Sequence, residues 1–101
     1  MNSIKIYESL INKAKNRTYD IEYFENHHII PRCFGGSDKT SNIVKLSYRE
    51  HYLAHWLLVK IQTDYHKKLQ MSCAFLLMSK SNNGKRNTNS KMYDKAKQYI
   101  F

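Results

Sequence analysis

The sequence predicts a small α+β domain, and three observations support this class. The chain has 101 residues, which is enough for one compact domain and too few for two. Hydrophobic residues make up 42% of the chain, a proportion that is sufficient for a buried core. Its segments follow the order helix, two short strands separated by a glycine turn, and then further helices.

The N-terminal segment 3–16 is predicted to be a helix. Its apolar residues recur at spacings of three and four, and Asn2 or Ser3 is available as the N-cap. We expect a connector to follow at residues 17–20, so that residues 1–20 form an N-terminal helical unit.

Two strands are predicted next, paired antiparallel. Residues 23–30 are rich in aromatic and β-branched side chains and stop at Pro31. Gly35 and Gly36 indicate a turn within a loop that reaches about residue 41. Residues 43–46 then form a short second strand.

The second half of the chain is predicted to be helical. Ser47 and Glu50 have the spacing of a capping box, so a helix begins there and runs to about Ile61. Thr63 or Asp64 can cap the next helix, whose buried stripe is expected to consist of Leu69, Cys73, Leu76 and Leu77. A polar loop over 81–89 and a last helix complete a C-terminal unit, residues 63–101.

Large aromatic side chains are expected to be in the core rather than to stack on bases. This applies to Tyr23, Phe24, Tyr52, Trp56 and Phe75.

The charge of the chain points to a polyanionic partner. Lys and Arg number 17 against 8 Asp and Glu, a formal net charge of +9, and nucleic acid is the commonest partner for such a protein. Residues 80–97 are especially basic, and Lys85, Arg86 and Lys91 are expected to contact a DNA backbone.

The longest apolar runs, such as 74–78, fall far below a membrane span of about 20 residues, so no membrane association is expected. The two cysteines form no CxxC pair, which fits a reducing cytoplasm.

Four of the five histidines occur in two close pairs. His51 and His55 are four residues apart, so on a helix they share one face and can bind one metal ion. His27 and His28 are adjacent, so in a strand only one of them can join that ion directly. Either pair alone is more often a packing feature, but the combination within one short hairpin and helix indicates a metal site.

Together these segments resemble a known family. The residues are Glu25–Arg32, Gly35–Gly36, Asn42–Val44 and Arg49–His55. They are similar to the HNH motif of ββα-metal nucleases, closest to the small HNH endonucleases encoded by phages and mobile elements. The resemblance implies that residues 1–101 are a single HNH nuclease domain in which 23–61 form the ββα-metal core.

The resemblance also assigns roles to individual residues. It implies that His28 is the general base and that His27, His51 and His55 hold one divalent cation. Asn42 would brace the loop next to His28. Glu25 would orient an arginine toward the phosphate, and that arginine would be Arg17 or Arg32.

These roles imply a metal-dependent DNA endonuclease that cuts or nicks one strand of double-stranded DNA per site, as a monomer or a homodimer. A neutral imidazole can accept a proton from water near pH 7. Three imidazoles suit Zn or Ni better than Mg, although Mg or Mn can support turnover. Arg32 is also a candidate phosphate contact.

Two other interpretations remain open from the sequence. The same histidines can hold a structural zinc in a module that binds nucleic acid without cutting it. A toxin-like nuclease that a partner protein neutralises is a third possibility. The expected location is the cytoplasm of a phage-infected or bacterial host cell.

Overall fold

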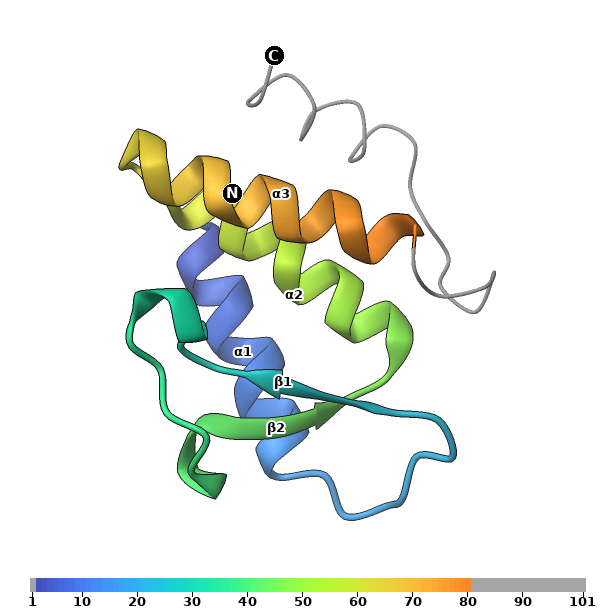
Figure 1. The fold of residues 1–101 in the computed structure, drawn as a ribbon. Helices are drawn as coiled ribbons and strands as arrows, with labels where there is room; N and C mark the ends of the chain where they lie inside the picture. The colour runs from blue at the N-terminus through green and yellow to red at the C-terminus, as the bar shows by residue number, and fades with distance from the viewer. Residues whose placement is uncertain (1, 81–101) are drawn as a thin grey trace.

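The computed structural model describes residues 2–80 of the chain, and these confirm the α+β class (Figure 1). The elements are α1 (Ser3–Lys15), β1 (Glu25–His28), β2 (Ile43–Leu46), α2 (Tyr48–Ile61) and α3 (Tyr65–Lys80). Short 3-10 turns at Arg32–Phe34 and Thr40–Asn42 lie in the loop between the strands. Lys85, Arg86 and Lys91, with the polar loop and last helix expected around them, lie outside the described residues.

The helix starts follow the capping residues in the sequence. The side chain of Asn2 accepts a hydrogen bond from a backbone N–H in the first turn of α1. Ser47 and Glu50 form the complete capping box of α2, and Asp64 accepts a backbone N–H at the start of α3. Because each cap depends on residues within one turn, local sequence was enough to predict these starts.

The two strands pair antiparallel, and their register places His27 and His28 on opposite faces of the hairpin. His27 lies opposite Val44, and His28 lies opposite Ile43. Since cross-strand partners share a face of the sheet and successive residues alternate, His27 lies on the face of the buried Val44. His28 therefore lies on the opposite, outer face of the hairpin.

The first strand is shorter than the predicted range 23–30, because its end bonds to a side chain. The Ile29 N–H donates to the backbone carbonyl of Asn42. The Ile30 N–H donates to the Asn42 side-chain oxygen, and the Asn42 amide donates back to the Ile30 carbonyl. At Ile30 the side chain of Asn42 thus takes the place of a backbone partner, and the regular strand ends at His28.

The glycine pair has a steric function in this loop. Gly35 has a φ of 89°, in the left-handed region. A Cβ on Gly36 would lie 1.7 Å from the Ile30 carbonyl oxygen and 2.9 Å from the Asn42 side-chain amide. The loop can therefore close around Asn42 only with glycine at position 36.

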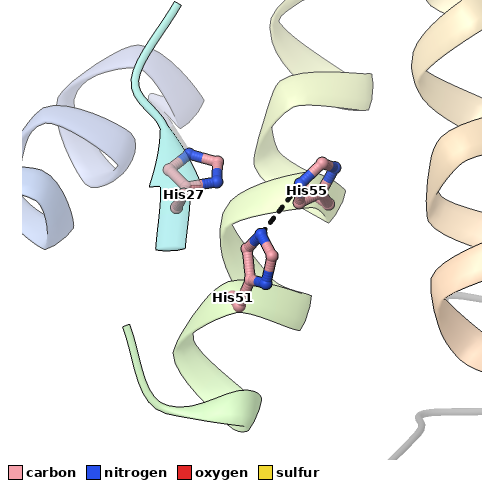
Figure 2. A group of neighbouring side chains, drawn as sticks. All are labelled: His27, His51 and His55. Carbon is pink, nitrogen blue, oxygen red and sulfur yellow. Dashed lines mark hydrogen bonds between the residues drawn. The ribbon is translucent and has the colours of Figure 1, made fainter. Parts of the chain in front are cut away.

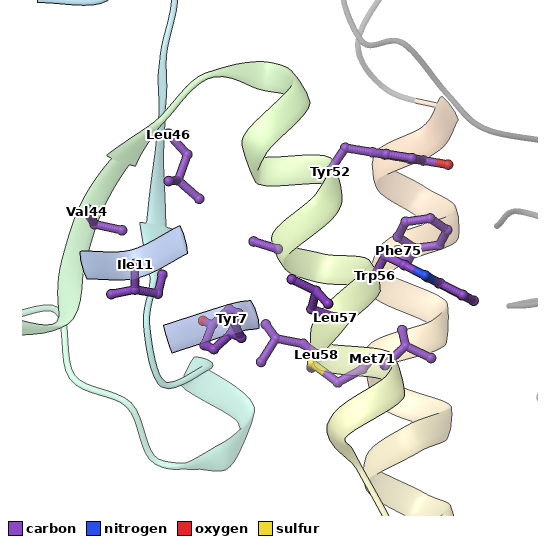
Figure 3. Close-up of a cluster of buried hydrophobic side chains, with 12 residues drawn as sticks. Tyr7, Ile11, Val44, Leu46, Tyr52, Trp56, Leu57, Leu58, Met71 and Phe75 are labelled. Atoms are coloured by element: carbon purple, nitrogen blue, oxygen red, sulfur yellow. The ribbon is translucent and has the colours of Figure 1, made fainter. Parts of the chain in front are cut away.

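Helix α2 is the centre of the core (Figure 3). It lies between α3 on one side and α1 with the hairpin on the other (Figure 1).

The aromatic residues expected in the core are only partly there. Tyr52, Trp56 and Phe75 are buried as expected, and the centroid of the Phe75 ring lies 4.6 Å from that of Tyr52 and 5.4 Å from that of Trp56. Tyr23 and Phe24 are exposed by 60% and 39%, so the expectation that they are in the core was wrong. They precede the shortened strand, outside the packed region.

The buried side of α3 also differs from the expected stripe. Met71, Ser72, Phe75 and Met78 are buried. Leu77 is 68% exposed and Cys73 is exposed, while Leu69 and Leu76 are half-buried. Apolar residues occur on several sides of this helix, so its periodicity did not select one face. The contact with α2 decides which face is buried.

No helix among residues 2–80 combines the length and the apolar character that crossing a membrane requires.

Candidate metal centre

Three of the histidines meet between β1 and α2 (Figure 2). His27 comes from the inner face of β1, and His51 and His55 come from adjacent turns of α2. Their ring centroids lie 5.1 Å (His27 to His51), 5.3 Å (His27 to His55) and 4.8 Å (His51 to His55) apart. One nitrogen from each ring can be chosen so that all three lie within 4.8 Å of one another. The structure therefore brings together the three residues that the HNH resemblance implies as ligands.

The spacing of the two helical histidines suits a shared ion. The Nε2 atoms of His51 and His55 are 3.2 Å apart (Figure 2). Two nitrogens bound at about 2.0–2.1 Å to one tetrahedral zinc ion would lie about 3.3 Å apart. The two imidazoles thus already have nearly the separation that such an ion imposes.

His27 is a buried, neutral imidazole with an unused nitrogen. It is 1% exposed, and burial lowers its pKa to about 3, assisted by repulsion from the other histidines. Its Nε2 lies 2.7 Å from the Tyr7 hydroxyl, whereas its Nδ1 is buried and has no hydrogen-bond partner among residues 2–80. A buried acceptor without a donor is costly, and a cation is one group that would satisfy it.

Glu25 acts on this cluster through His51. Its Oε1 lies 3.0 Å from the His51 Nδ1, in the geometry of an N–H donating to a carboxylate. That bond leaves the His51 Nε2 lone pair directed at His55, the arrangement in which a carboxylate orients a metal-binding histidine. The structure thus gives Glu25 a contact with His51, and its expected role of orienting an arginine stays a prediction.

The donor set fits a transition metal. Three neutral imidazoles match the preferences of Zn, Ni or Cu better than those of Mg, which takes oxygen ligands. Three protein ligands also leave a coordination position for water or a phosphate oxygen, as in catalytic rather than structural zinc sites.

His28 lies near this cluster but has different partners. It is close enough that its charge contributes to lowering the pKa of His27. Its Nε2 lies 2.8 Å from the Asp38 Oδ1, and the same oxygen accepts the Arg32 Nε–H at 2.9 Å. The hydrogen bonds from His28 and then Arg32 lower the pKa of Asp38, so the carboxylate is ionised and can only accept. The His28 Nε2 therefore carries a proton and donates it to Asp38, so in the neutral imidazole the lone pair is on Nδ1.

Asn42 has the contacts of a loop brace. It is buried, and besides its bonds to Ile29 and Ile30 its side-chain amide donates to the Ser37 carbonyl at 2.8 Å. These contacts join the start and the end of the loop directly beside His28.

The two candidate arginines have different environments. The Arg17 side chain is 7% exposed, and its Nη2 donates to both carboxylate oxygens of Glu50 at 2.6 and 2.8 Å. Burial raises the pKa of Glu50, but hydrogen bonds from Ser47 and Arg17 outweigh this effect and lower it overall. Arg17 thus joins the end of α1 to the start of α2, whereas the Arg32 side chain is 70% exposed.

Sequence reasoning missed two residues of this region. Tyr7 lies among the regularly spaced apolar residues of segment 3–16, and its hydroxyl gives no separate signal in the sequence. Asp38 lies in the loop after the two glycines, where aspartate is common for reasons unrelated to histidine. Both contact histidines that are distant in sequence, so only the folded chain reveals them.

The fold and this cluster define a class: a small α+β protein with a three-histidine candidate metal centre between a strand and a helix.

No family model matches the chain, and no solved structure matches it. Curated proteins of Enterobacteria phage T4 do match it, among them the following three. "Probable mobile endonuclease E" is 44% identical over 100 residues, covering 97% of this chain and 69% of that protein. "Probable mobile endonuclease D" is 52% identical over 65 residues, 60% of this chain and 25% of that protein. "Probable mobile endonuclease C" is 41% identical over 102 residues, 98% of this chain and 46% of that protein.

The chain belongs to the family of these phage mobile endonucleases. It spans about two thirds of mobile endonuclease E and less than half of the other two.

Proposed function

We propose that this protein is a metal-dependent DNA endonuclease of the HNH type, with residues 1–101 as its nuclease domain. His27, His51 and His55 hold one divalent ion, and His28 is the general base. One observation carries the proposal: three imidazole nitrogens converge within 4.8 Å in a chain that belongs to a mobile endonuclease family.

The chain's own residues supply the proton transfer. When bound, a divalent ion stabilises negative charge on the phosphoryl oxygens and on the leaving oxygen. The His28 Nδ1 lone pair accepts a proton from the attacking water, and the Asp38 carboxylate stabilises the resulting imidazolium through Nε2. A general base of this kind contributes about 10²- to 10⁴-fold to the rate. Asn42 holds in place the backbone that directly follows His28.

The substrate is assigned by charge. A net charge of +9 favours a polyanion, and the exposed Arg32 lies beside His28 through their shared partner Asp38. We assign backbone contacts to Arg32 and to Lys85, Arg86 and Lys91. Contacts of this type give affinity that falls steeply with salt and carry little sequence information. A phage DNA substrate puts the reaction in the cytoplasm of an infected cell.

A plasmid assay tests the proposal. Supercoiled plasmid is incubated with the protein and with Mg²⁺, Mn²⁺ or Zn²⁺ in turn, and nicked product is measured over time. We expect nicking with at least one ion and its loss on chelation. His28→Ala is expected to slow nicking about 10²- to 10⁴-fold, while zinc binding stays at the wild-type level.

The control is His66→Ala, which removes an exposed imidazole from α3. It should nick at the wild-type rate. If plasmid stays intact with every ion while the protein still shifts DNA in a gel, the enzyme is excluded and the zinc-stabilised binding module remains. Equal nicking by His28→Ala and wild type would remove His28 from the mechanism.

A further inference from the structure

We propose that Tyr7 is a positioning residue of the metal centre: its hydroxyl fixes the His27 imidazole with the proton on Nε2, so that Nδ1 is the atom offered to the ion. This inference rests on the proposed metal site and assigns a function to α1, which lies outside the strand–helix core of that site.

The contact joins two elements that are distant in sequence. The Tyr7 hydroxyl lies 2.7 Å from the His27 Nε2 and 2.8 Å from the Ile29 carbonyl oxygen. The two rings meet edge to face, with centroids 6.0 Å apart. Both side chains are buried, Tyr7 at 8% exposure and His27 at 1%. Water therefore does not substitute easily for either hydrogen bond.

The direction of the two bonds follows from the available protons. The Ile29 carbonyl can only accept, so it takes the single hydroxyl proton of Tyr7. The Tyr7 oxygen must then accept the second bond, and its donor is the His27 Nε2–H.

The remaining nitrogen of His27 is then the one that faces the cluster. A neutral imidazole carries one proton, and with that proton on Nε2 the lone pair is on Nδ1. Nδ1 is the atom without a hydrogen-bond partner, and Figure 2 shows the ring directed toward His51 and His55. The other tautomer would point an N–H at these two imidazoles and leave the Ile29 carbonyl without its donor.

Removal of the hydroxyl should therefore weaken metal binding more than it weakens the fold. In Tyr7→Phe the ring remains in the core, but neither His27 tautomer is favoured by a partner. Loss of such outer partners typically costs 10- to 100-fold in metal affinity. We expect a loss of about that size for Zn²⁺.

Zinc affinity, measured by competition with a chromophoric chelator, tests this for the wild type, Tyr7→Phe and Ile11→Val. Ile11 lies on α1 and is buried, and the valine loses one methylene without touching a hydrogen bond. We expect Ile11→Val to bind Zn²⁺ like the wild type. If both variants lost the same amount of Zn²⁺ affinity, the effect of Tyr7→Phe would be general destabilisation and the proposal would be overturned. Wild-type Zn²⁺ affinity in Tyr7→Phe would overturn it as well.

A second measurement needs no metal. Long-range ¹H–¹⁵N spectra of the metal-free wild type should show His27 with its proton on Nε2, and Tyr7→Phe should show a mixture of tautomers. A wild-type His27 protonated on Nδ1 would overturn the proposal. These readouts are independent of cleavage: a protein that binds Zn²⁺ in a Tyr7-dependent way but never nicks DNA would refute the proposed enzyme and leave this inference standing.

Discussion

The inner and outer faces of the hairpin differ although the residues that define them are sequence neighbours. His27 is 1% exposed and contacts Tyr7 and the two helical histidines, whereas the His28 side chain is 23% exposed and contacts Asp38. Burial favours a neutral imidazole with a lone pair for a cation, while access to water suits a residue that must exchange protons with solvent. Alternation along one short strand thus gives two identical side chains different chemistry.

The largest effect is expected from a change on the inner face. His55→Ala removes one of the three proposed ligands, so we expect nicking to fall to background and the thermal stabilisation by Zn²⁺ to disappear. His55 is preferred to His27 for this test because His27 is buried and bonded to Tyr7, so its removal also disturbs the core.

Thermal unfolding with and without a chelator measures this prediction. The wild type should melt at a lower temperature when the metal is removed, because its ligands join β1 to α2. His66→Ala is again the matched control. An unchanged midpoint for the wild type would show that the cluster does not hold a stabilising ion.

A smaller effect is expected from the outer face. Asp38→Asn keeps the size of the side chain and one acceptor oxygen but removes the charge beside His28. We expect nicking to fall roughly 10-fold with zinc affinity unchanged, measured with the plasmid assay and the chelator competition. Asp64→Asn, at the cap of α3, is the control for loss of an exposed aspartate charge. Loss of zinc affinity in Asp38→Asn would contradict the separation of the two faces.

The smallest effect is expected on stability. Arg17→Met keeps much of the buried stem and removes the bonds to Glu50. We expect it to lower the free energy of unfolding by about 1.5 kcal/mol, the lower end for hydrogen bonds to charged groups, because Glu50 keeps some access to water. Arg32→Met on the exposed side should change stability little, since surface ion pairs contribute about 0–1 kcal/mol. Urea denaturation gives the free energy of unfolding of both variants. Equal decreases would refute the expectation that the buried ion pair stabilises the fold more than the exposed one.

The site was more predictable than the packing. The resemblance to HNH nucleases implied the three histidines, and the structure brings these three together. The resemblance did not identify Tyr7 or Asp38. Neither a tyrosine in an apolar helix face nor an aspartate in a turn indicates, from sequence alone, a contact with a distant histidine. The buried face of α3 and the exposure of Tyr23 and Phe24 were predicted incorrectly, because both depend on which surface α2 and the hairpin present.

By itself, the sequence determined what depends on neighbours along the chain. The capping residues fixed the helix starts, and a spacing of four put His51 and His55 on one face of a helix. Only the tertiary structure decided which of the two adjacent histidines joins them, which hydroxyl holds that histidine and which side of α3 is buried. The physical reason is that caps and periodicity act within one turn, whereas these three outcomes depend on the packing of α1, the hairpin and α3 around α2.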